Sequence, residues 1–205
     1  IEKNPMSQLQ VASSKKALPK YLTLEQSIAL LDSVSGKDME RDYCILTLFL
    51  NCGLRLAELV GLNITDISFD NETMVVTGKG NKERMIFLND ACKQALEDWL
   101  GERSGMGLID KNALFVTRQN HKRITTAAVH KLVKKHLAAA GLDSTQYSSH
   151  KLRHTAATLM YRYGNVDVRV LQEMLGHSDI SSTQVYAHMI NQKIKTVYDK
   201  CHPKA

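Results

Sequence analysis

The sequence lacks the features that mark a membrane protein, a secreted disulfide scaffold or a zinc module. No apolar run among its 205 residues approaches the ~20 residues that span a bilayer, and the opening IEKNPMSQLQ has no signal-peptide core. The four cysteines are scattered and form no C-x-x-C pair. Cys44 and Cys52 fall in an apolar helical pattern, which predicts small core residues rather than metal ligands or disulfides. Such cysteine usage is typical of a reducing cytoplasm.

Charge is unevenly distributed along the chain. A hydrophobic content of 43% and a charged content of 23% predict one globular domain with its own core. The net charge is +6, and residues 101–205 carry 16 lysines and arginines against 7 acidic residues, whereas residues 1–100 carry 11 against 14. A basic half is typical of proteins that bind polyanions such as nucleic acid, although a solvated basic surface would give the same composition.

The residue pattern divides the chain into an arm and a domain. Residues 1–20 contain two prolines, three neighbouring lysines and few large apolar side chains. This composition is typical of a linker or arm, and it suggests that another segment precedes it. Residues 21–205 are predicted to form the domain itself.

Most of the predicted elements are helices. A capping box from Thr23 to Gln26 opens the first helix, and Leu24, Ile28 and Leu31 give it an apolar stripe. Further helices are predicted at 38–51, 55–60, 90–103, 125–140, 150–163, 167–175, 181–188 and 191–200, and short strands at 64–69, 73–77 and 84–88. This order predicts an α+β fold that is mainly helical, with a small antiparallel β-sheet.

Two segments in the first half could contact phosphate. GLRLAEL at 53–59 places Arg55 and Glu58 on one helix face, so the carboxylate can orient a guanidinium whose donors match phosphate oxygens. GKGNKER at 78–84 predicts a basic hairpin without P-loop spacing, and Lys79 at its tip could enter a minor groove or protonate a leaving oxygen. An ordinary intrahelical ion pair and a solvated turn would also explain these segments.

Two later segments add histidines, an arginine and a tyrosine. His150 and Arg153 share a face at a helix start, where free N–H groups favour an anion. His150 and His154 have the spacing of the H-E-x-x-H zinc ligands, but the glutamate is missing and no metal is predicted. Tyr186 lies nine residues after His177, on another predicted helix. A tyrosine is a nucleophile candidate beside cationic groups, and otherwise it is packing material.

Together these segments resemble the catalytic domain of tyrosine recombinases, the phage-type integrases, and most of all their bacterial Xer-like branch. The resemblance covers about Leu18 to Val197 and rests on four motifs in order: G-L-R-x-x-E-L, G-K-G-N-K-E-R, H-x-x-R, and L-G-H with a tyrosine nine residues later. It implies the catalytic-domain fold of that family. It also implies that residues 1–20 are a connector from an N-terminal core-binding domain. Residues 191–200 would be a C-terminal helix that docks on a neighbouring protomer or packs in cis.

The resemblance assigns three residues to the scissile phosphate and one residue to their support. Arg55 and Arg153 would bind its non-bridging oxygens, and His177 would hydrogen-bond to it. Glu58 would support Arg55. Further contacts with the DNA are expected from the basic residues Lys82, Arg84 and Lys151.

The chemical steps are assigned to three other residues. Tyr186 would attack phosphorus and form a 3′-phosphotyrosyl link. Lys79 would protonate the leaving 5′ oxygen, with Lys82 the less favoured candidate for that role. His150 would assist proton transfer as a base toward the tyrosine. No metal or cofactor takes part in this scheme.

The implied activity is site-specific recombination of double-stranded DNA. It would serve chromosome dimer resolution, or integration and excision of a mobile element. The chain would act as a homo- or hetero-tetramer on DNA and as a monomer without it, in the bacterial cytoplasm at the nucleoid. Two alternatives remain open: a type IB topoisomerase-like relaxation activity, and a DNA-binding module without catalysis.

Overall fold

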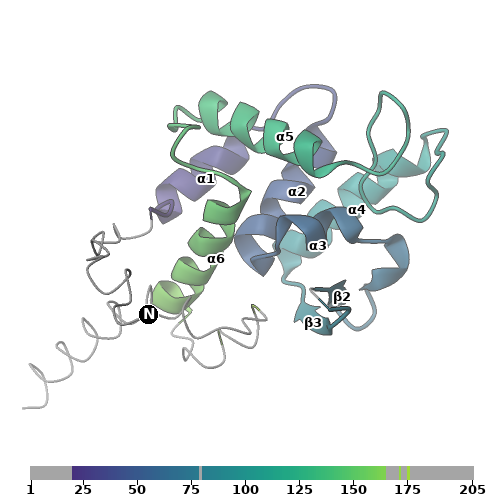
Figure 1. Ribbon diagram of the computed structural model, residues 1–205, viewed down its shortest axis with the longest axis horizontal. Helices are drawn as coiled ribbons and strands as arrows, with labels where there is room; N and C mark the ends of the chain where they lie inside the picture. The colour runs from purple at the N-terminus through teal and green to yellow at the C-terminus, as the bar shows by residue number, and fades with distance from the viewer. Residues whose placement is uncertain (1–19, 79, 165–170, 172–174, 176–205) are drawn as a thin grey trace, which may run out of the picture.

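Six α-helices and one small sheet make up the described residues, which are 20–78, 80–164, Leu171 and Leu175 of the computed structural model (Figure 1). The elements in chain order are α1 (Leu24–Asp32), α2 (Met39–Cys52), α3 (Leu56–Gly61), the 3₁₀ turn η2 (Ile64–Asp66), β1 (Ile67–Ser68), β2 (Thr73–Thr77), β3 (Glu83–Phe87), α4 (Asp90–Ser104), α5 (Thr126–Ala139) and α6 (Ser149–Tyr163). The helices predicted at 181–188 and 191–200, and most of the one at 167–175, lie outside the described residues.

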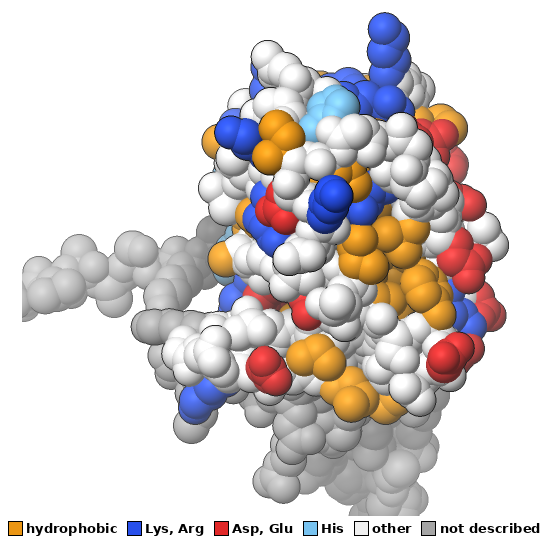
Figure 2. All heavy atoms as spheres, turned by 90° about the vertical axis from the view of Figure 1, so that its right-hand side faces the viewer, with side chains coloured by type: hydrophobic (Ala, Val, Ile, Leu, Met, Phe, Trp, Pro, Cys, Tyr) orange, Lys and Arg blue, Asp and Glu red, His pale blue; other side chains and the backbone are white. Residues whose placement is uncertain are grey.

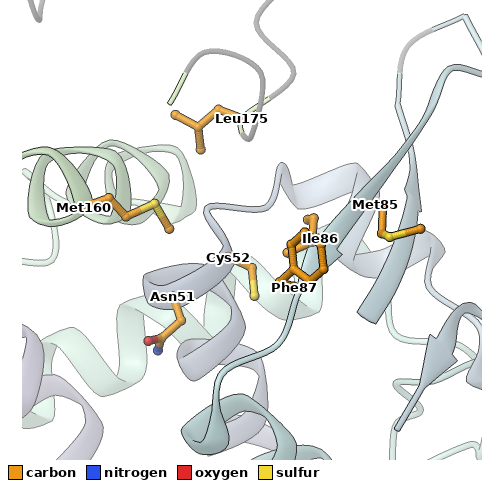
Figure 3. Close-up of a pocket in the computed structure, with 7 residues that line it drawn as sticks. All are labelled: Asn51, Cys52, Met85, Ile86, Phe87, Met160 and Leu175. Carbon is orange, nitrogen blue, oxygen red and sulfur yellow. The ribbon is translucent and has the colours of Figure 1, made fainter. Parts of the chain in front are cut away.

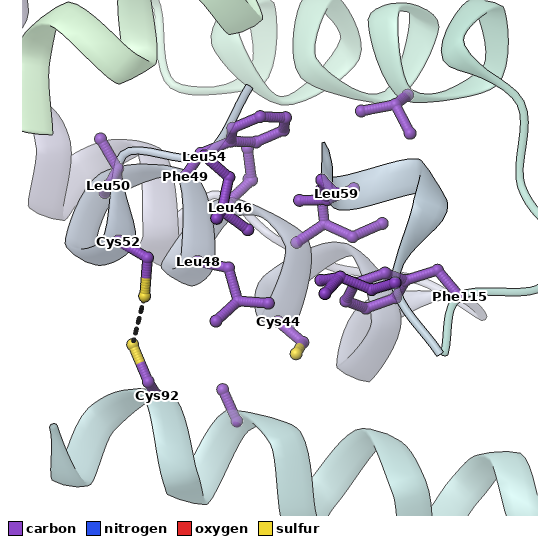
Figure 4. Close-up of a cluster of buried hydrophobic side chains, with 14 of the residues drawn as sticks. Cys44, Leu46, Leu48, Phe49, Leu50, Cys52, Leu54, Leu59, Cys92 and Phe115 are labelled. Carbon is purple, nitrogen blue, oxygen red and sulfur yellow. Dashed lines mark hydrogen bonds between the residues drawn. The ribbon is translucent and has the colours of Figure 1, made fainter. Parts of the chain in front are cut away.

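Helix α2 is the centre of the core, with α4 and α6 packed against it. Its side chains Ile45, Leu48 and Phe49 have no exposed surface. Cys44 and Cys52 are buried in the same core, which confirms their prediction as packing residues. Figure 4 shows Cys52 of α2 facing Cys92 of α4, with the two sulfur atoms 3.8 Å apart. Desolvation raises the pKa of the Cys44 thiol, as expected for a cysteine that only packs.

The start of α1 was predicted correctly, but its buried face was not. The side chain of Gln26 accepts a hydrogen bond from the Thr23 backbone N–H, and the Thr23 hydroxyl accepts one from Gln26 N–H. The predicted stripe is wrong at Leu24 and Ile28, which are 39% and 51% exposed, whereas Ser27 and Leu30 are buried. Ser27 can be buried because its hydroxyl donates to the Thr23 carbonyl at 2.8 Å.

The sheet is antiparallel, in the order β1-β2-β3. The strand predicted at 64–69 is largely wrong, because residues 64–66 form a 3₁₀ turn. That turn is stabilised by the Asp66 carboxylate, which accepts from Asn63 N–H at 2.8 Å. The strands predicted at 73–77 and 84–88 are confirmed as β2 and, one residue earlier, β3. The pairing of Val76 with Arg84 leads into the hairpin tip.

An irregular segment at 105–124 completes the core, and no element was predicted there. Its residues Ala113 to Val116 are almost fully buried. The Trp99 indole N–H donates to the Leu114 carbonyl at 2.9 Å, and Arg103 donates to the carbonyl of Ala113.

Figure 2 views the molecule from the right-hand side of Figure 1. On this face, lysine and arginine side chains lie toward the top and apolar side chains gather near the centre. No helix in the described part of the chain is long and apolar enough to cross a membrane.

The fold is therefore mainly helical with a small antiparallel sheet, as the sequence predicted. Helix α2 ends at Gly53, whose left-handed backbone (φ 59°) turns the chain directly into α3. This turn, the hairpin between β2 and β3, and helix α6 bring together the segments that were predicted to carry chemistry.

Candidate active site

Glu58 is the centre of a buried ionic cluster. It lies on α3, and its side chain is only 2% exposed. One carboxylate oxygen accepts from Arg55 Nη1 at 2.7 Å and the other accepts from the Arg55 backbone N–H at 2.7 Å. The predicted i, i+3 pairing of Arg55 with Glu58 is confirmed. The Arg55 side chain remains 39% exposed, so its guanidinium is fixed at the surface.

Arg84 of β3 binds the same carboxylate from the other side. Its Nη1 and Nη2 donate to the two oxygens of Glu58 at 2.7 and 2.9 Å, which is the bidentate geometry of a strong ion pair. The predicted contact of Arg84 with DNA stays a prediction, but the structure shows an interaction with Glu58 that sequence reasoning missed. A signal was present: Arg84 alternates with Ile86 and Leu88, which are both buried, so it lies on the inner face of its strand.

The electrostatics of Glu58 follow from these contacts. Burial acts to raise the pKa of its carboxyl group, but hydrogen bonds from Arg84 and Arg55 outweigh burial and lower the pKa to about 2. Glu58 is therefore ionised at neutral pH. A carboxylate that is buried, charged and fully paired fixes the positions of the guanidinium groups around it.

Arg153 approaches the cluster from α6. Its side chain is 7% exposed, and its Nη1 lies 4.0 Å from a carboxylate oxygen of Glu58. Nη1 also donates to the Gly53 carbonyl at 2.5 Å, and Nη2 donates to the Leu175 carbonyl at 2.6 Å. The structure thus brings together Arg55, Glu58 and Arg153, which lie up to 98 positions apart in the sequence, as one preorganised group.

The two histidines of α6 lie at the outer edge of this group. His150 is exposed, and its Nε2 lies 3.0 Å from Nε2 of His154 on the next turn. Partial desolvation, then Arg153, then Lys151 lower the pKa of His150. His150 is therefore neutral at neutral pH and able to accept a proton. The residues that follow His154, from Thr155 to Thr158, are buried.

The hairpin tip connects to the cluster through its described ends. Gly78 N–H donates to the Lys82 carbonyl at 2.8 Å, and a Cβ atom on Gly78 would lie 3.4 Å from Glu58 Oε1. Lys82 is exposed beside the tip. Lys79, His177 and Tyr186 lie outside the described residues, so their predicted roles stay predictions.

A pocket of about 260 Å³ lies beside the ionic cluster (Figure 3). It is lined by side chains from the end of α2, from β3, from α6 and by Leu175: Asn51, Cys52, Met85, Ile86, Phe87, Met160 and Leu175. Among the described residues this lining is mostly apolar and contains no charged group. The described side chains that suit a phosphate are those of the arginine and histidine cluster.

The arrangement suits the binding of a phosphodiester. Two guanidinium groups held by one carboxylate can neutralise charge on non-bridging oxygens without reorganising during the reaction. A neutral histidine at the edge of the group can take up a proton. The cluster contains no nucleophile among the described residues, so a complete reaction needs a group from elsewhere in the chain.

Comparison with known proteins identifies relatives over almost the whole chain. Residues 20–193 match the phage integrase family. Tyrosine recombinase XerC of Caldanaerobacter subterraneus subsp. tengcongensis is 52% identical over 98% of this chain and 56% of the relative. Tyrosine recombinase XerC of Alcanivorax borkumensis is 38% identical over 98% of this chain and 66% of the relative. The chain therefore spans about half to two thirds of the length of these relatives.

Solved structures share the fold. The crystal structure of XerA recombinase has a TM-score of 0.76 and 28% identity, covering 91% of this chain and 67% of that one. The post-cleavage complex of the XerH site-specific recombinase with its palindromic difH substrate has a TM-score of 0.77 and 28% identity, covering 90% and 54%. The agreement in sequence and in fold has one explanation: the chain belongs to the phage integrase family.

Proposed function

We propose that the chain is the catalytic part of a site-specific DNA recombinase that cleaves and rejoins strands through a 3′-phosphotyrosyl intermediate. The observation that carries the proposal is the buried Glu58 carboxylate, which holds Arg55 close to Arg153. Paired arginines of this kind are suited to binding the oxygens of a phosphate group. The relatives named tyrosine recombinase and the XerH complex with DNA support the same reading.

In this proposal Tyr186 attacks phosphorus while Arg55, Arg153 and His177 hold the non-bridging oxygens. His150 accepts the phenolic proton, because its lowered pKa keeps it neutral. Lys79 protonates the departing 5′ oxygen. The phosphotyrosyl bond replaces the cleaved phosphodiester bond, so a 5′-hydroxyl can reverse the reaction without a nucleotide cofactor. Removal of one anion-stabilising donor in such a site costs ~10²–10³ in rate.

The partner would be double-stranded DNA, on which several copies of the chain would assemble. Lys82, in the hairpin opposite Gly78, and Lys151, next to His150 on α6, would add contacts with the backbone phosphates. Binding should weaken steeply with salt, because each neutralised phosphate releases counterions. Assembly through residues 191–200 stays a prediction, since those residues lie outside the described ones.

A covalent-trapping experiment tests the proposal. The chain is incubated with a nicked half-site duplex whose short 5′-hydroxyl fragment diffuses away after cleavage, and the SDS-stable adduct is located by mass spectrometry. We expect an adduct on Tyr186, which Tyr186→Phe abolishes while salt-sensitive binding persists. Cleavage by Tyr186→Phe would refute the nucleophile. Relaxation of a plasmid without a recombination site would favour the topoisomerase-like alternative.

A further inference from the structure

Arg123 binds the C-terminal end of α3. Its Nη1 atom lies within hydrogen-bonding distance of three successive carbonyl oxygens, those of Val60 at 3.1 Å, Gly61 at 3.0 Å and Leu62 at 2.8 Å. Its Nη2 atom donates to the side-chain oxygen of Asn63 at 2.6 Å. The last carbonyl groups of a helix have no partner within the helix and carry its partial negative charge. The Arg123 guanidinium therefore pairs with and neutralises this end of α3.

Arg123 is itself anchored to the core. Its Nε atom lies 3.3 Å from Oδ2 of Asp110, and Oδ1 of that carboxylate accepts from the Ala113 backbone N–H at 2.9 Å. The Arg123 backbone pairs with Val116, and both Ala113 and Val116 are fully buried. All three guanidinium nitrogen atoms of Arg123 thus contact oxygen atoms of the protein. Arg123 therefore acts within the protein rather than as a phosphate ligand.

Helix α3 needs such a contact because it is too short to fix its own orientation. It has six residues, so it is roughly 9 Å long, and isolated helices of fewer than about 12 residues are marginal in water. Glu58 and Leu59, which are both buried, hold its middle. A helix held only at its middle can pivot there, and a pivot that displaces the C-terminal end also displaces the N-terminal end. Arg123 holds the first of these ends, and Arg55 is the N-cap at the second.

We propose that Arg123 is a positioning residue for DNA cleavage: it prevents this pivot and so fixes the Arg55 guanidinium. The inference rests on the proposed function, in which Arg55 binds a non-bridging oxygen of the scissile phosphate. The Arg55 side chain is 39% exposed, and its Nη1 pairs with Glu58 of the same helix. Because that pair moves with α3, it does not by itself fix Arg55 relative to α6, which carries Arg153. A misplacement of about 1 Å in a reacting group can cost roughly 10² in rate.

The link between the two arginines is tested by ¹⁵N relaxation of the Arg55 Nε–H group in the DNA-free chain. Arg123→Gln removes the guanidinium, and Arg123→Lys keeps the charge but cannot bind every acceptor, in case the glutamine variant folds poorly. Arg118→Gln is the matched control, because it removes a nearby arginine whose ion-pair partners, Asp38 and Glu102, lie outside α3. We expect the order parameter to fall to about 0.6 or lower in Arg123→Gln, to be intermediate in Arg123→Lys and to match wild type in Arg118→Gln. Equal values in all four folded proteins would overturn the link.

The catalytic effect is tested by covalent trapping at saturating half-site DNA, in which the rate constant and the final yield are measured separately. A residue that only stabilises the fold changes the yield, because less protein is folded, whereas a positioning residue changes the rate constant. We expect Arg123→Gln to lower the rate constant by roughly 10–10², Arg123→Lys to lower it less, and Arg118→Gln to leave it at the wild-type value. An unchanged rate constant in Arg123→Gln would overturn the catalytic role.

A methylphosphonate at the cleavage site tests whether the effect passes through Arg55. This group is uncharged, because a methyl replaces one non-bridging oxygen, so its cleavage depends less on a fixed guanidinium. The defect of Arg123→Gln should shrink at least about threefold on this substrate, and an undiminished defect would exclude Arg55 as the intermediary. A wild type that forms no adduct with the phosphodiester would contradict the proposed function, while the relaxation measurement would still decide whether Arg123 holds Arg55.

Discussion

The two sides of the candidate active site differ in how their side chains are held and in their exposure to solvent. On one side Glu58, at 2% side-chain exposure, binds Arg55 and Arg84 through hydrogen bonds of 2.7–2.9 Å. On the other side His150 is exposed and lies against His154. The arginine side is fixed before any ligand arrives, whereas the histidine side is open to solvent. Substitutions on the first side should affect both folding and catalysis, and substitutions on the second should affect catalysis alone.

The largest effect on stability is expected from Glu58→Ala. It leaves two arginines beside a buried site without their counter-charge, which typically costs ~3–5 kcal/mol of unfolding free energy. Urea denaturation measures this loss. Glu83→Ala, which removes an exposed glutamate from the same hairpin, should stay within about 0.5 kcal/mol of wild type. Similar losses for the two variants would show that the cluster is not stabilising.

Acid should remove a comparable part of the unfolding free energy, because it protonates Glu58. The pKa of Glu58 is lowered from 4.5 to about 2 in the folded chain, so its contribution is complete above pH 4.5 and is lost as the pH falls toward 2. A shift of this size corresponds to roughly 3 kcal/mol. The difference in unfolding free energy between wild type and Glu58→Gln should therefore shrink only below pH 4.5. A difference that does not change with pH would contradict the ionised pair.

Arg84→Gln is expected to have a smaller effect, of ~1.5–3 kcal/mol, because hydrogen bonds to a charged group are lost while Arg55 still pairs with Glu58. Arg84→Lys should not restore stability, since a lysine cannot bind both oxygens in fork geometry.

Covalent trapping should slow in both Arg84 variants. If the ion pair positions the hairpin that carries Lys79, a substrate with a 5′-bridging sulfur should recover much of the rate, because that leaving group needs no proton.

Arg103→Gln is the control for this experiment. Arg103 is another buried arginine, and it donates to carbonyl oxygens of residues 110–113 away from the site. We expect a loss of stability without any selective recovery on the sulfur substrate. Equal recovery in the Arg103 and Arg84 variants would mean that Arg84 only stabilises the fold.

The smallest effect on stability is expected from His150→Gln, within about 0.5 kcal/mol, because the side chain is exposed. Its effect on cleavage should nevertheless be large, at ~10²–10⁴ for loss of a proton acceptor. The lowered pKa of His150 also means that wild-type cleavage should persist as the pH falls below the ordinary histidine value of 6.5. A rate that already declines well above pH 6.5 would exclude His150 as the base.

Local patterns in the sequence predicted local structure well. The capping box at Thr23 and the pairing of Arg55 with Glu58 each depend on residues within four positions, and both are present in the structure, although Arg55 caps α3 instead of lying within it. The buried face of α1 was mispredicted, because Leu24 and Ile28 fit a helical period equally well. Which face is buried depends on helices distant in sequence, and a buried serine satisfied by its own helix hides the true face.

Long-range pairing was harder to predict. Arg84 and Glu58 are 26 positions apart, and only the strand register brings them together. The alternation of Arg84 with Ile86 and Leu88 indicated an inward side chain, but not its partner. The strand predicted at 64–69 failed for a similar reason: Ile64 N–H bonds to the Asn112 carbonyl, in a segment with no predicted element.

Gly53 has a practical consequence for anyone who would redesign this protein. Its backbone is left-handed, its carbonyl accepts from Arg153, and a Cβ atom there would lie 2.6 Å from Leu175 Cδ2. Most substitutions at this position should destabilise the fold, because the left-handed backbone disfavours a side chain and a Cβ atom would displace the Leu175 side chain. Libraries aimed at new target sequences should hold position 53 constant and vary the exposed hairpin positions 82 and 83, which lack the left-handed backbone found at Gly53 and at Asn81 (φ 57°).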